Sequence, residues 1–256
     1  MVDASPCITP MSTVPKLSKD QGVPFSDPKF YRTIVGGLQY LSVTGPDICY
    51  AVNRVCQFMA APTLSHWQAV KRLLRYLKGT SSYGLIFRKP TNLKLTAFSD
   101  ADWATDIDDR RSTSGFCVYF GGNLISWSSK KQQVVSRSST EAEYRSLAAV
   151  VAEISWIKSL LQELRITLSS APTVYCDNIS AVHMTANPIL HARTKHVELD
   201  IHFVREKAIV GEISVLHVPS TDQVADGFTK PLSKQLFLDF RSYLMIGDRN
   251  HLLEGG

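Results

Sequence analysis

Residues 115–129 read GFCVYFGGNLISWSS, and this stretch decides the class of fold. Two runs rich in aromatic and β-branched residues flank Gly121, Gly122 and Asn123, a short glycine-containing turn that is typical of a β-hairpin. Upstream, residues 93–100 read LKLTAFSD, a run of small and apolar residues that ends in an acid. We therefore expect three strands here, two of them paired in a hairpin.

Helices and further strands are expected after the hairpin. The pattern predicts a helix from about residue 139 to 164, a buried strand at 173–177 and a helix at 179–186. An amphipathic helix at 194–209 and a strand at 212–219 follow. This order predicts an α/β fold with a mixed sheet and helices packed on it.

Four segments organise the chain. Residues 1–25, rich in Pro, Ser and Thr, are expected to form an extended lead-in that enters from an absent domain. Residues 26–80 are expected to be helical, with Asp27 and a first-turn proline at the start. Residues 90–232 then form the α/β domain, and 233–256 a C-terminal helix and tail.

The composition is that of an ordinary globular protein, with 44% hydrophobic and 20% charged residues. The net charge of +5 fits a polyanionic partner without requiring one. The five cysteines form no C-x-x-C pair, which argues against a disulfide framework or zinc cage and favours a reducing compartment. Because no long apolar window and no secretory signal occur, we expect an intracellular protein, cytoplasmic or nuclear, with no membrane partner.

Four carboxylates stand where solubility does not explain them: Asp100, Glu143, Asp177 and Asp226. Three of them lie where a predicted strand ends or a predicted helix begins, among apolar or small neighbours. Carboxylate oxygens are the ligands of hard divalent cations, and a hydrolase uses such a group to hold metal ions against a phosphodiester. We therefore take these four as candidate catalytic and metal-binding residues.

Three of these acids, Asp100, Asp177 and Asp226, have an ordinary structural alternative. Asp100 and Asp102 could both be turn residues at a strand end, and Asp102 is the better outer group because Asp100 adjoins the apolar run. Asp177 could cap the next helix, but Asn178 could do so equally well and leave Asp177 to face a metal. Asp226 alone would more often be an exposed helix acid.

Helical phase separates Glu143 from its neighbour Glu141. At about 100° per residue, Glu143 projects onto the apolar stripe that includes Leu147 and Ile154, whereas Glu141 points to nearly the opposite side. Glu141 also stands three residues after Ser138, the spacing of a capping box, so it has a structural role of its own. Glu143 has no such explanation.

Other motifs are either ambiguous or absent. Lys71, Arg75 and Lys78 share one face of a predicted helix, which is either a solvated face or a contact with phosphates.

Five histidines cluster in the second half of the chain: His183, His191, His196, His202 and His217. They show neither i,i+4 spacing nor an H-E-x-x-H arrangement, so zinc catalysis is not supported. No G-x-S-x-G, P-loop or G-x-G-x-x-G motif occurs, so serine-hydrolase, nucleotide-triphosphatase and dinucleotide readings lack support.

The chain resembles the ribonuclease H region of copia-type LTR-retrotransposon Pol polyproteins. The stretches that carry this resemblance are FSDADWA at 98–104, DRRSTSGFCVYFGGNLISWSSKKQQVVSRSSTEAEYRSL at 109–147, VYCDNISAV at 174–182, RTKHVELDIHFVRE at 193–206 and HVPSTDQVADGFTKPL at 217–232. Residues 31–80 resemble the segment that joins reverse transcriptase to ribonuclease H in the same family. The likeness covers about residues 30–245, and its motifs occur in the family's order.

The resemblance implies a five-stranded mixed sheet, with three antiparallel and two parallel strands, flanked by helices. It also implies an Asp-Glu-Asp-Asp site, which corresponds here to Asp100, Glu143, Asp177 and Asp226. Such a site would hold two Mg²⁺ ions about 4 Å apart, with Mn²⁺ as an alternative and no small-molecule cofactor. The implied reaction is hydrolysis of the RNA strand of an RNA–DNA hybrid.

The implied partners are the hybrid and the rest of a Pol polyprotein. Because hybrids are recognised through backbone shape and 2′-hydroxyls, basic side chains near the site are expected to contact phosphates. The candidates for these nucleic-acid contacts are Lys71, Arg75, Lys130, Lys131, Arg137 and Arg145.

Two departures from the family pattern leave rival hypotheses open. The Asp-Asp pair of a polymerase site is missing, since Asp108 and Asp109 lie in a polar turn, so DNA synthesis is not expected. Residues 219–221 lack the histidine that cellular ribonucleases H carry there, which predicts a slower or different final step. One rival is a weak or silent nucleic-acid-binding remnant of a decayed element. The other is an integrase-like transesterase, which the four acids disfavour.

Overall fold

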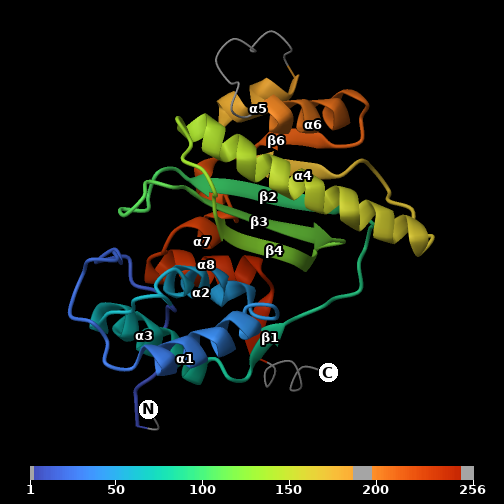
Figure 1. Ribbon diagram of the computed structural model, residues 1–256. Coiled ribbons are helices and arrows are strands. Elements are labelled where there is room, and N and C mark those ends of the chain that lie inside the picture. The colour runs from blue at the N-terminus through green and yellow to red at the C-terminus, as the bar shows by residue number, and fades with distance from the viewer. Residues whose placement is uncertain (1–2, 187–197, 249–256) are drawn as a thin grey trace. The chain divides into compact units, whose positions relative to one another are not determined.

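The computed structural model describes residues 3–186 and 198–248, and the chain divides into two compact units (Figure 1). The helical unit comprises Met1–Ile86 with Lys230–Gly256, and the sheet unit comprises Phe87–Thr229. The start of the helix expected from residue 194, together with His191 and His196, lies outside the described residues. Among the described helices, none combines the length and apolar character that a membrane span requires.

The sheet unit contains a five-stranded mixed sheet with the order β4-β3-β2-β5-β6. β2, β3 and β4 pair antiparallel, and β5 and β6 continue the sheet parallel to β2. This arrangement confirms the ribonuclease H-like fold class expected from the sequence. The strands are β2 (Leu95–Asp102), β3 (Thr113–Phe120), β4 (Asn123–Lys131), β5 (Thr173–Cys176) and β6 (Ser214–His217).

The predicted hairpin joins β3 to β4. Gly121 and Gly122 both have positive φ, +57° and +86°, a backbone conformation that residues other than glycine rarely adopt. At Gly121 a Cβ would also lie 2.3 Å from the Cβ of Pro90, so this position has no room for a side chain. The turn brings Phe120 opposite Asn123, and the register of the two strands shifts between Val118 and Tyr119.

Helix α4 (Ser139–Glu163) lies against one face of this sheet (Figure 1), and its apolar side chains pack on the strands there. The side chains of Leu147, Val151 and Ile154 are fully buried against strand residues such as Ala97 and Phe116. Helices α5 (Ile179–Ala186) and α6 (Glu198–Ile209) contact α4 and each other and extend the same core. α4 therefore reaches the sheet with a fixed rotation, which determines where its acids point.

A short helical turn, α7 (Asp226–Thr229), packs against β2, β3 and β4. Gly115 of β3 makes this approach possible, since a Cβ there would lie 2.6 Å from the Cβ of Phe228. Phe116, the next residue along β3, belongs to the α4 core, so Gly115 and α7 lie on the opposite face of the sheet. Because Gly115 pairs with Asp100 in register, α7 lies beside Asp100.

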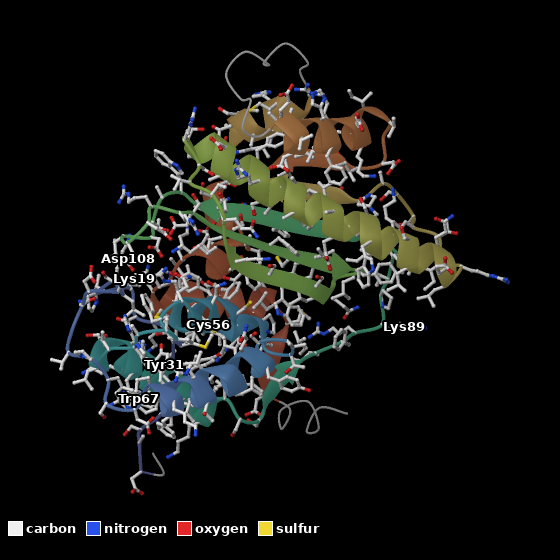
Figure 2. The ribbon with its side chains drawn as sticks, viewed as in Figure 1. Lys19, Tyr31, Cys56, Trp67, Lys89 and Asp108 are labelled. Atoms are coloured by element: carbon white, nitrogen blue, oxygen red, sulfur yellow. The ribbon has the colours of Figure 1, made fainter. Side chains whose placement is uncertain are left out.

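The helical unit combines the two ends of the chain. Its elements are α1 (Pro28–Leu41), η1 (Pro46–Ile48), α2 (Cys49–Cys56), α3 (Leu64–Gly79), β1 (Tyr83–Leu85), α8 (Lys234–Tyr243) and β7 (Ile246–Asp248). Asp27 caps α1 as predicted, accepting the N–H of Phe30 at 2.9 Å. Tyr31 of α1 packs near Trp67 of α3, with ring centroids 6.5 Å apart (Figure 2).

The C-terminal helix belongs to this unit rather than standing alone. The ring of Phe237 on α8 packs edge-on against Tyr76 of α3, with centroids 5.5 Å apart. β1 and β7 form a two-stranded antiparallel sheet, which the sequence did not predict. The helix expected after residue 233 is present as α8 (Lys234–Tyr243), and the short strand Ile246–Asp248 in the expected tail was not foreseen, because three residues are too few to show a period.

Candidate active site

Three of the four predicted acids meet at the edge of the sheet where β2 and β5 end. Asp100 lies on β2, Glu143 in the first turns of α4, and Asp177 directly after β5. Asp100 and Glu143 are 4% and 5% exposed, so both carboxyl groups are nearly withdrawn from water. A carboxylate seldom occupies such a place unless it is paired or binds a metal.

The position of Glu143 follows from the phase of α4, as predicted. Its Oε1 accepts the backbone N–H of Ala101 at 3.1 Å, which holds the side chain beside Asp100. Glu141 instead lies at the helix start, where it accepts the N–H of Arg137 at 2.9 Å and pairs with Arg145 at 3.0 Å. The N–H of Glu141 itself binds the Ser138 hydroxyl at 3.1 Å. Glu141 is thus part of the helix cap, and Glu143 is the acid that points inward.

Burial raises the pKa of Glu143 far above its ordinary value, and the charges of Asp100 and Asp177 raise it further. The N–H of Ala101 acts in the other direction but is too weak to compensate. Among the described residues, no basic group contributes to lowering this pKa. A cation placed among the three carboxylates would oppose this shift, because it supplies the missing opposite charge.

Asp177 is available for such a cation because it does not cap the next helix. Asn178 takes that role, accepting the N–H of Ala181 through its Oδ1 at 3.0 Å, which confirms the alternative drawn from the sequence. One oxygen of Asp177 accepts the hydroxyl of Ser220 at 2.9 Å. Ser220 comes from the loop that lacks the histidine of cellular ribonucleases H, so this loop reaches the site with a hydroxyl.

Cys176 is a member of the site that the sequence did not indicate. Ligand atoms of Glu143, Cys176 and Asp177 all lie within 4.8 Å of one another, and the thiol donates to Oε2 of Glu143 at 3.8 Å. Burial, followed by the nearby Glu143 charge, raises the pKa of the Cys176 thiol, so it stays protonated and acts as a donor. The only signal for it was its place between a buried strand and a candidate acid.

These donors fit a hard divalent cation. Carboxylate oxygens suit Mg²⁺ or Mn²⁺, whereas a soft ion would need a thiolate, which Cys176 does not offer in its protonated form. Asp100, Glu143 and Asp177 could hold such an ion from three different elements, β2, α4 and the end of β5.

Asp226 reaches the site through the backbone of α7. It is the first residue of this turn and is half-buried. The hydroxyl of Thr229, at the other end of the turn, contacts the carbonyl oxygen of Asp226 at 3.1 Å and hydrogen-bonds to Oδ2 of Asp100. Among the described residues, the ligand atoms that lie within 4.8 Å of one another belong to Glu143, Cys176 and Asp177, and neither Asp100 nor Asp226 is in this group. Asp100 is tied to it through its interaction with Glu143, and Asp226 through Thr229, which contacts Asp100.

The predicted phosphate contacts lie in different surroundings. Lys130 and Arg137 are exposed in the sheet unit. Lys131 pairs with Asp106 and Asp109, each at 2.8 Å, and Arg145 pairs with Glu141. These three ion pairs fall within the sheet unit and give Lys131 and Arg145 structural roles that sequence reasoning missed.

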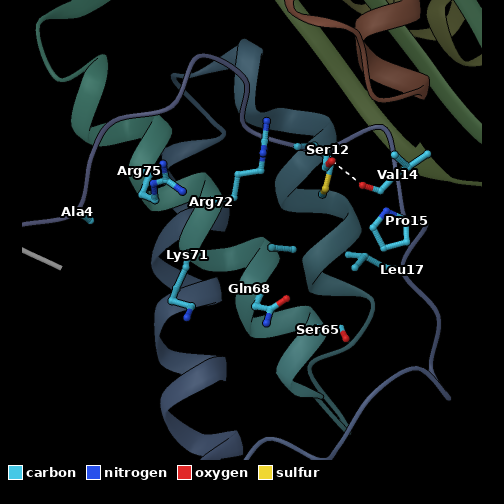
Figure 3. Close-up of a pocket in the computed structure, with 12 residues that line it drawn as sticks. Ala4, Ser12, Val14, Pro15, Leu17, Ser65, Gln68, Lys71, Arg72 and Arg75 are labelled. Carbon is cyan, nitrogen blue, oxygen red and sulfur yellow. Dashed lines mark hydrogen bonds between the residues drawn. The ribbon is translucent and has the colours of Figure 1, made fainter.

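Lys71 and Arg75 lie in the helical unit, where α3 and the lead-in line a cavity of about 520 Å³ (Figure 3). Arg75 donates to the carbonyl of Ser5 at 2.6 Å, and Lys78 donates to that of Ala4 at 3.0 Å. This face of α3 is therefore partly covered by the lead-in, an outcome that neither the solvated nor the phosphate-binding interpretation foresaw.

Comparison with known proteins places this arrangement in context. No family model matches the chain. It is 54% identical over 240 residues to the retrovirus-related Pol polyprotein from transposon RE2 of Arabidopsis thaliana, a match that covers 94% of this chain and 16% of the relative. The corresponding polyprotein from transposon TNT 1-94 of Nicotiana tabacum is 38% identical over 244 residues, covering 93% of this chain and 18% of the relative. The chain thus spans less than a fifth of the length of these relatives.

Solved structures are similar at much lower identity. LC11-RNase H1 in complex with RNA/DNA hybrid is 14% identical, covers 53% of this chain and 94% of that chain, and has a TM-score of 0.39. The foamy viral protease-reverse transcriptase in complex with RNA/DNA hybrid is 12% identical, covers 79% of this chain and 26% of that chain, and has a TM-score of 0.46. The order and direction of the strands, rather than these alignments, identify the fold.

Proposed function

The chain belongs to the copia-type retrotransposon Pol polyprotein family, and from this premise we propose that its sheet unit is a metal-dependent ribonuclease H. The substrate would be an RNA–DNA hybrid, and the reaction hydrolysis of its RNA strand. One observation carries the proposal: two buried carboxyl groups, Asp100 and Glu143, lie with the half-buried Asp177 at one edge of a ribonuclease H-like sheet, and the three come from separate elements of the fold.

The energetic cost of this group argues for a catalytic use. Burying Glu143 next to Asp100 and Asp177 is unfavourable, as its raised pKa reflects. A fold that needed only a packed core would place apolar residues here, as it does one turn later on α4 at Leu147. Perturbed carboxyl groups of this kind concentrate at functional sites.

Each acid of the site is supported by a separate donor. The N–H of Ala101 orients Glu143, the Ser220 hydroxyl orients Asp177, and the Thr229 hydroxyl contacts Asp100. Two Mg²⁺ ions, with Mn²⁺ as the alternative, would be held by Asp100, Glu143, Asp177 and Asp226 and would supply positive charge for the attacking water and the leaving 3′ oxygen.

The hybrid would be held mainly through its backbone. Lys130 and Arg137 are exposed in the sheet unit and are the best placed of the predicted phosphate contacts. Lys131 and Arg145 already have acidic partners and would contribute less. Lys71 and Arg75 belong to the helical unit and remain candidates for a separate contact.

The test is cleavage of a labelled RNA–DNA hybrid in Mg²⁺ by the wild-type chain and by Asp177→Asn. Asp108→Asn is a matched control, because it makes the same carboxylate-to-amide change in the turn between β2 and β3. We expect the wild-type and Asp108→Asn proteins to cut the RNA strand and Asp177→Asn to lose this activity while remaining folded.

The rival function, a silent nucleic-acid-binding remnant, predicts a different result. In that case the wild-type protein binds the hybrid at the same concentrations but leaves both strands intact with either ion. Binding without cleavage would therefore overturn the proposed ribonuclease H activity. Equal cleavage by the wild-type and Asp177→Asn proteins would overturn the assignment of the site.

A further inference from the structure

Thr229 connects two of the candidate metal ligands. Its side chain is 1% exposed, and its Oγ1 lies within hydrogen-bonding distance of two oxygens, Oδ2 of Asp100 on β2 and the carbonyl of Asp226 in α7. Asp100 and Thr229 are 129 residues apart in sequence, so the contact depends on the packing of α7 against the sheet. No motif in the sequence pointed to this residue.

We propose that Thr229 is a positioning residue for the metal site, orienting Asp100 and coupling it to the turn that carries Asp226. The proposal rests on the ribonuclease H function proposed above, because it treats these two acids as metal ligands. Thr229 itself touches neither the substrate nor the reacting atoms and acts only through the carboxylate of Asp100.

The chemistry of a hydroxyl decides which of the two oxygens Thr229 donates to, the carboxylate of Asp100 or the backbone carbonyl of Asp226. A threonine hydroxyl has a single proton to donate, and an ionised carboxylate is a stronger acceptor than a backbone carbonyl. When Asp100 is ionised, the hydroxyl proton therefore goes to its Oδ2 and holds the orientation of this carboxylate. Donors of this kind orient metal ligands, and their loss typically weakens metal affinity or activity by about 10- to 100-fold.

The surroundings of α7 leave Thr229 little freedom to choose another partner. Phe228 is fully buried and fills the space above Gly115, whose missing side chain admits it. Gln223, just before the turn, donates through Nε2 to the carbonyl of Ser99 at 2.9 Å, and its Oε1 accepts the N–H of Ala225 at 3.1 Å. The segment is thus attached to β2 on both sides of Asp226, and its position determines the distance between Thr229 and Asp100.

Thr185 is the control for a purely structural role of Thr229. That threonine is also buried, at 4% exposure, and also bonds the carbonyl three residues earlier in its helix, Val182, at 2.7 Å. Among the described hydrogen bonds, its hydroxyl has no carboxylate partner. Thr185→Val therefore reproduces the packing and backbone changes of Thr229→Val without touching the candidate metal site.

The experiment compares the full chain with Thr229→Val, Thr229→Ser and Thr185→Val. The melting temperature is measured in EDTA and then across an Mg²⁺ titration, which reports metal binding without requiring activity. We expect both valine variants to lose stability in EDTA. We expect only Thr229→Val to need about 10-fold more Mg²⁺ for half of the stabilisation, and Thr229→Ser to restore the wild-type midpoint.

Three results would overturn the proposal. They are an unchanged Mg²⁺ midpoint in Thr229→Val, an equal shift in Thr185→Val, and a wild-type protein that Mg²⁺ does not stabilise. Cleavage of the hybrid is measured in parallel on the same proteins. If the wild-type chain binds Mg²⁺ with the expected difference between variants but never cuts, the ribonuclease H function fails while the positioning role of Thr229 stands.

Discussion

Replacing Glu143 with glutamine should stabilise the metal-free protein and remove its response to Mg²⁺. The carboxyl of Glu143 is 5% exposed and lies near Asp100 and Asp177, and burial followed by these two charges raises its pKa to about 10. Its ordinary pKa is 4.5. A group whose pKa is raised on folding contributes most to stability below its unfolded pKa, and this contribution is lost as the pH rises towards the folded pKa.

The loss of stability that Glu143 causes at pH 7 depends only on its pKa in the unfolded chain, provided that its pKa in the folded protein exceeds 7. Between pH 4.5 and pH 7 the folded protein loses at most about 3 kcal/mol, at 1.36 kcal/mol per pH unit. Glutamine does not ionise, so Glu143→Gln avoids this loss and keeps an oxygen that can accept the N–H of Ala101. For a chain of this size, 3 kcal/mol corresponds to a rise in Tm of roughly 6–12 °C at most.

Thermal denaturation in EDTA from pH 5 to pH 8, repeated with Mg²⁺, measures both effects. In EDTA the Tm of Glu143→Gln should exceed that of the wild type by more as the pH rises, and Mg²⁺ should stabilise only the wild type. Glu141→Gln is the matched control: it removes the same charge from the same helix but weakens the cap at Arg137 and the pair with Arg145, so it should lower stability by about 1 kcal/mol. If Glu143→Gln lowers Tm in EDTA as Glu141→Gln does, the argument from buried like charges is wrong.

Three further changes test other parts of the molecule. Lys130→Ala should weaken hybrid binding and reduce the dependence of log K on log salt by about 0.9, whereas Lys131→Ala, which loses its pairs with Asp106 and Asp109, should mainly lower Tm; binding across a salt series separates the two. Gly115→Ala should destabilise the sheet unit by about 1–3 kcal/mol, because a Cβ would lie 2.6 Å from that of Phe228, and urea unfolding measures this. Phe237→Ala should cost about 3–5 kcal/mol in the helical unit, because it removes the packing of α8 on Tyr76, and fluorescence-detected unfolding would show no change if α8 were only loosely attached.

Local patterns in the sequence were sufficient to predict much of the structure of the sheet unit. The glycine turn predicted the β3–β4 hairpin, and the 3.6-residue period of α4 predicted which of Glu141 and Glu143 is buried. Asn178 was recognised as a possible cap before the structure showed it bonded to Ala181. These predictions succeeded because each depends on residues within one or two turns of one another.

Contacts between distant segments could not be predicted in this way. β1 and β7 pair across more than 160 residues, and each is only three residues long, so neither shows an alternating pattern. Arg75 and Lys78 were correctly placed on one face of α3, but their partners are carbonyls of the lead-in, whose extended sequence carries no period. Spacing in the sequence predicts which residues share a face of a helix, but not which distant segment packs against that face.

Asp226 shows how the same distinction applies to the candidate site. Taken alone it had the sequence of an exposed helix acid, and only the family resemblance made it a candidate ligand. In the structure its place is determined by neighbours: Phe228 fills the space above Gly115, and Thr229 binds the carboxylate of Asp100. A substitution that shifts α7 must therefore move Asp226 and release Asp100 together, so the two acids should lose metal affinity as a pair even when neither is altered.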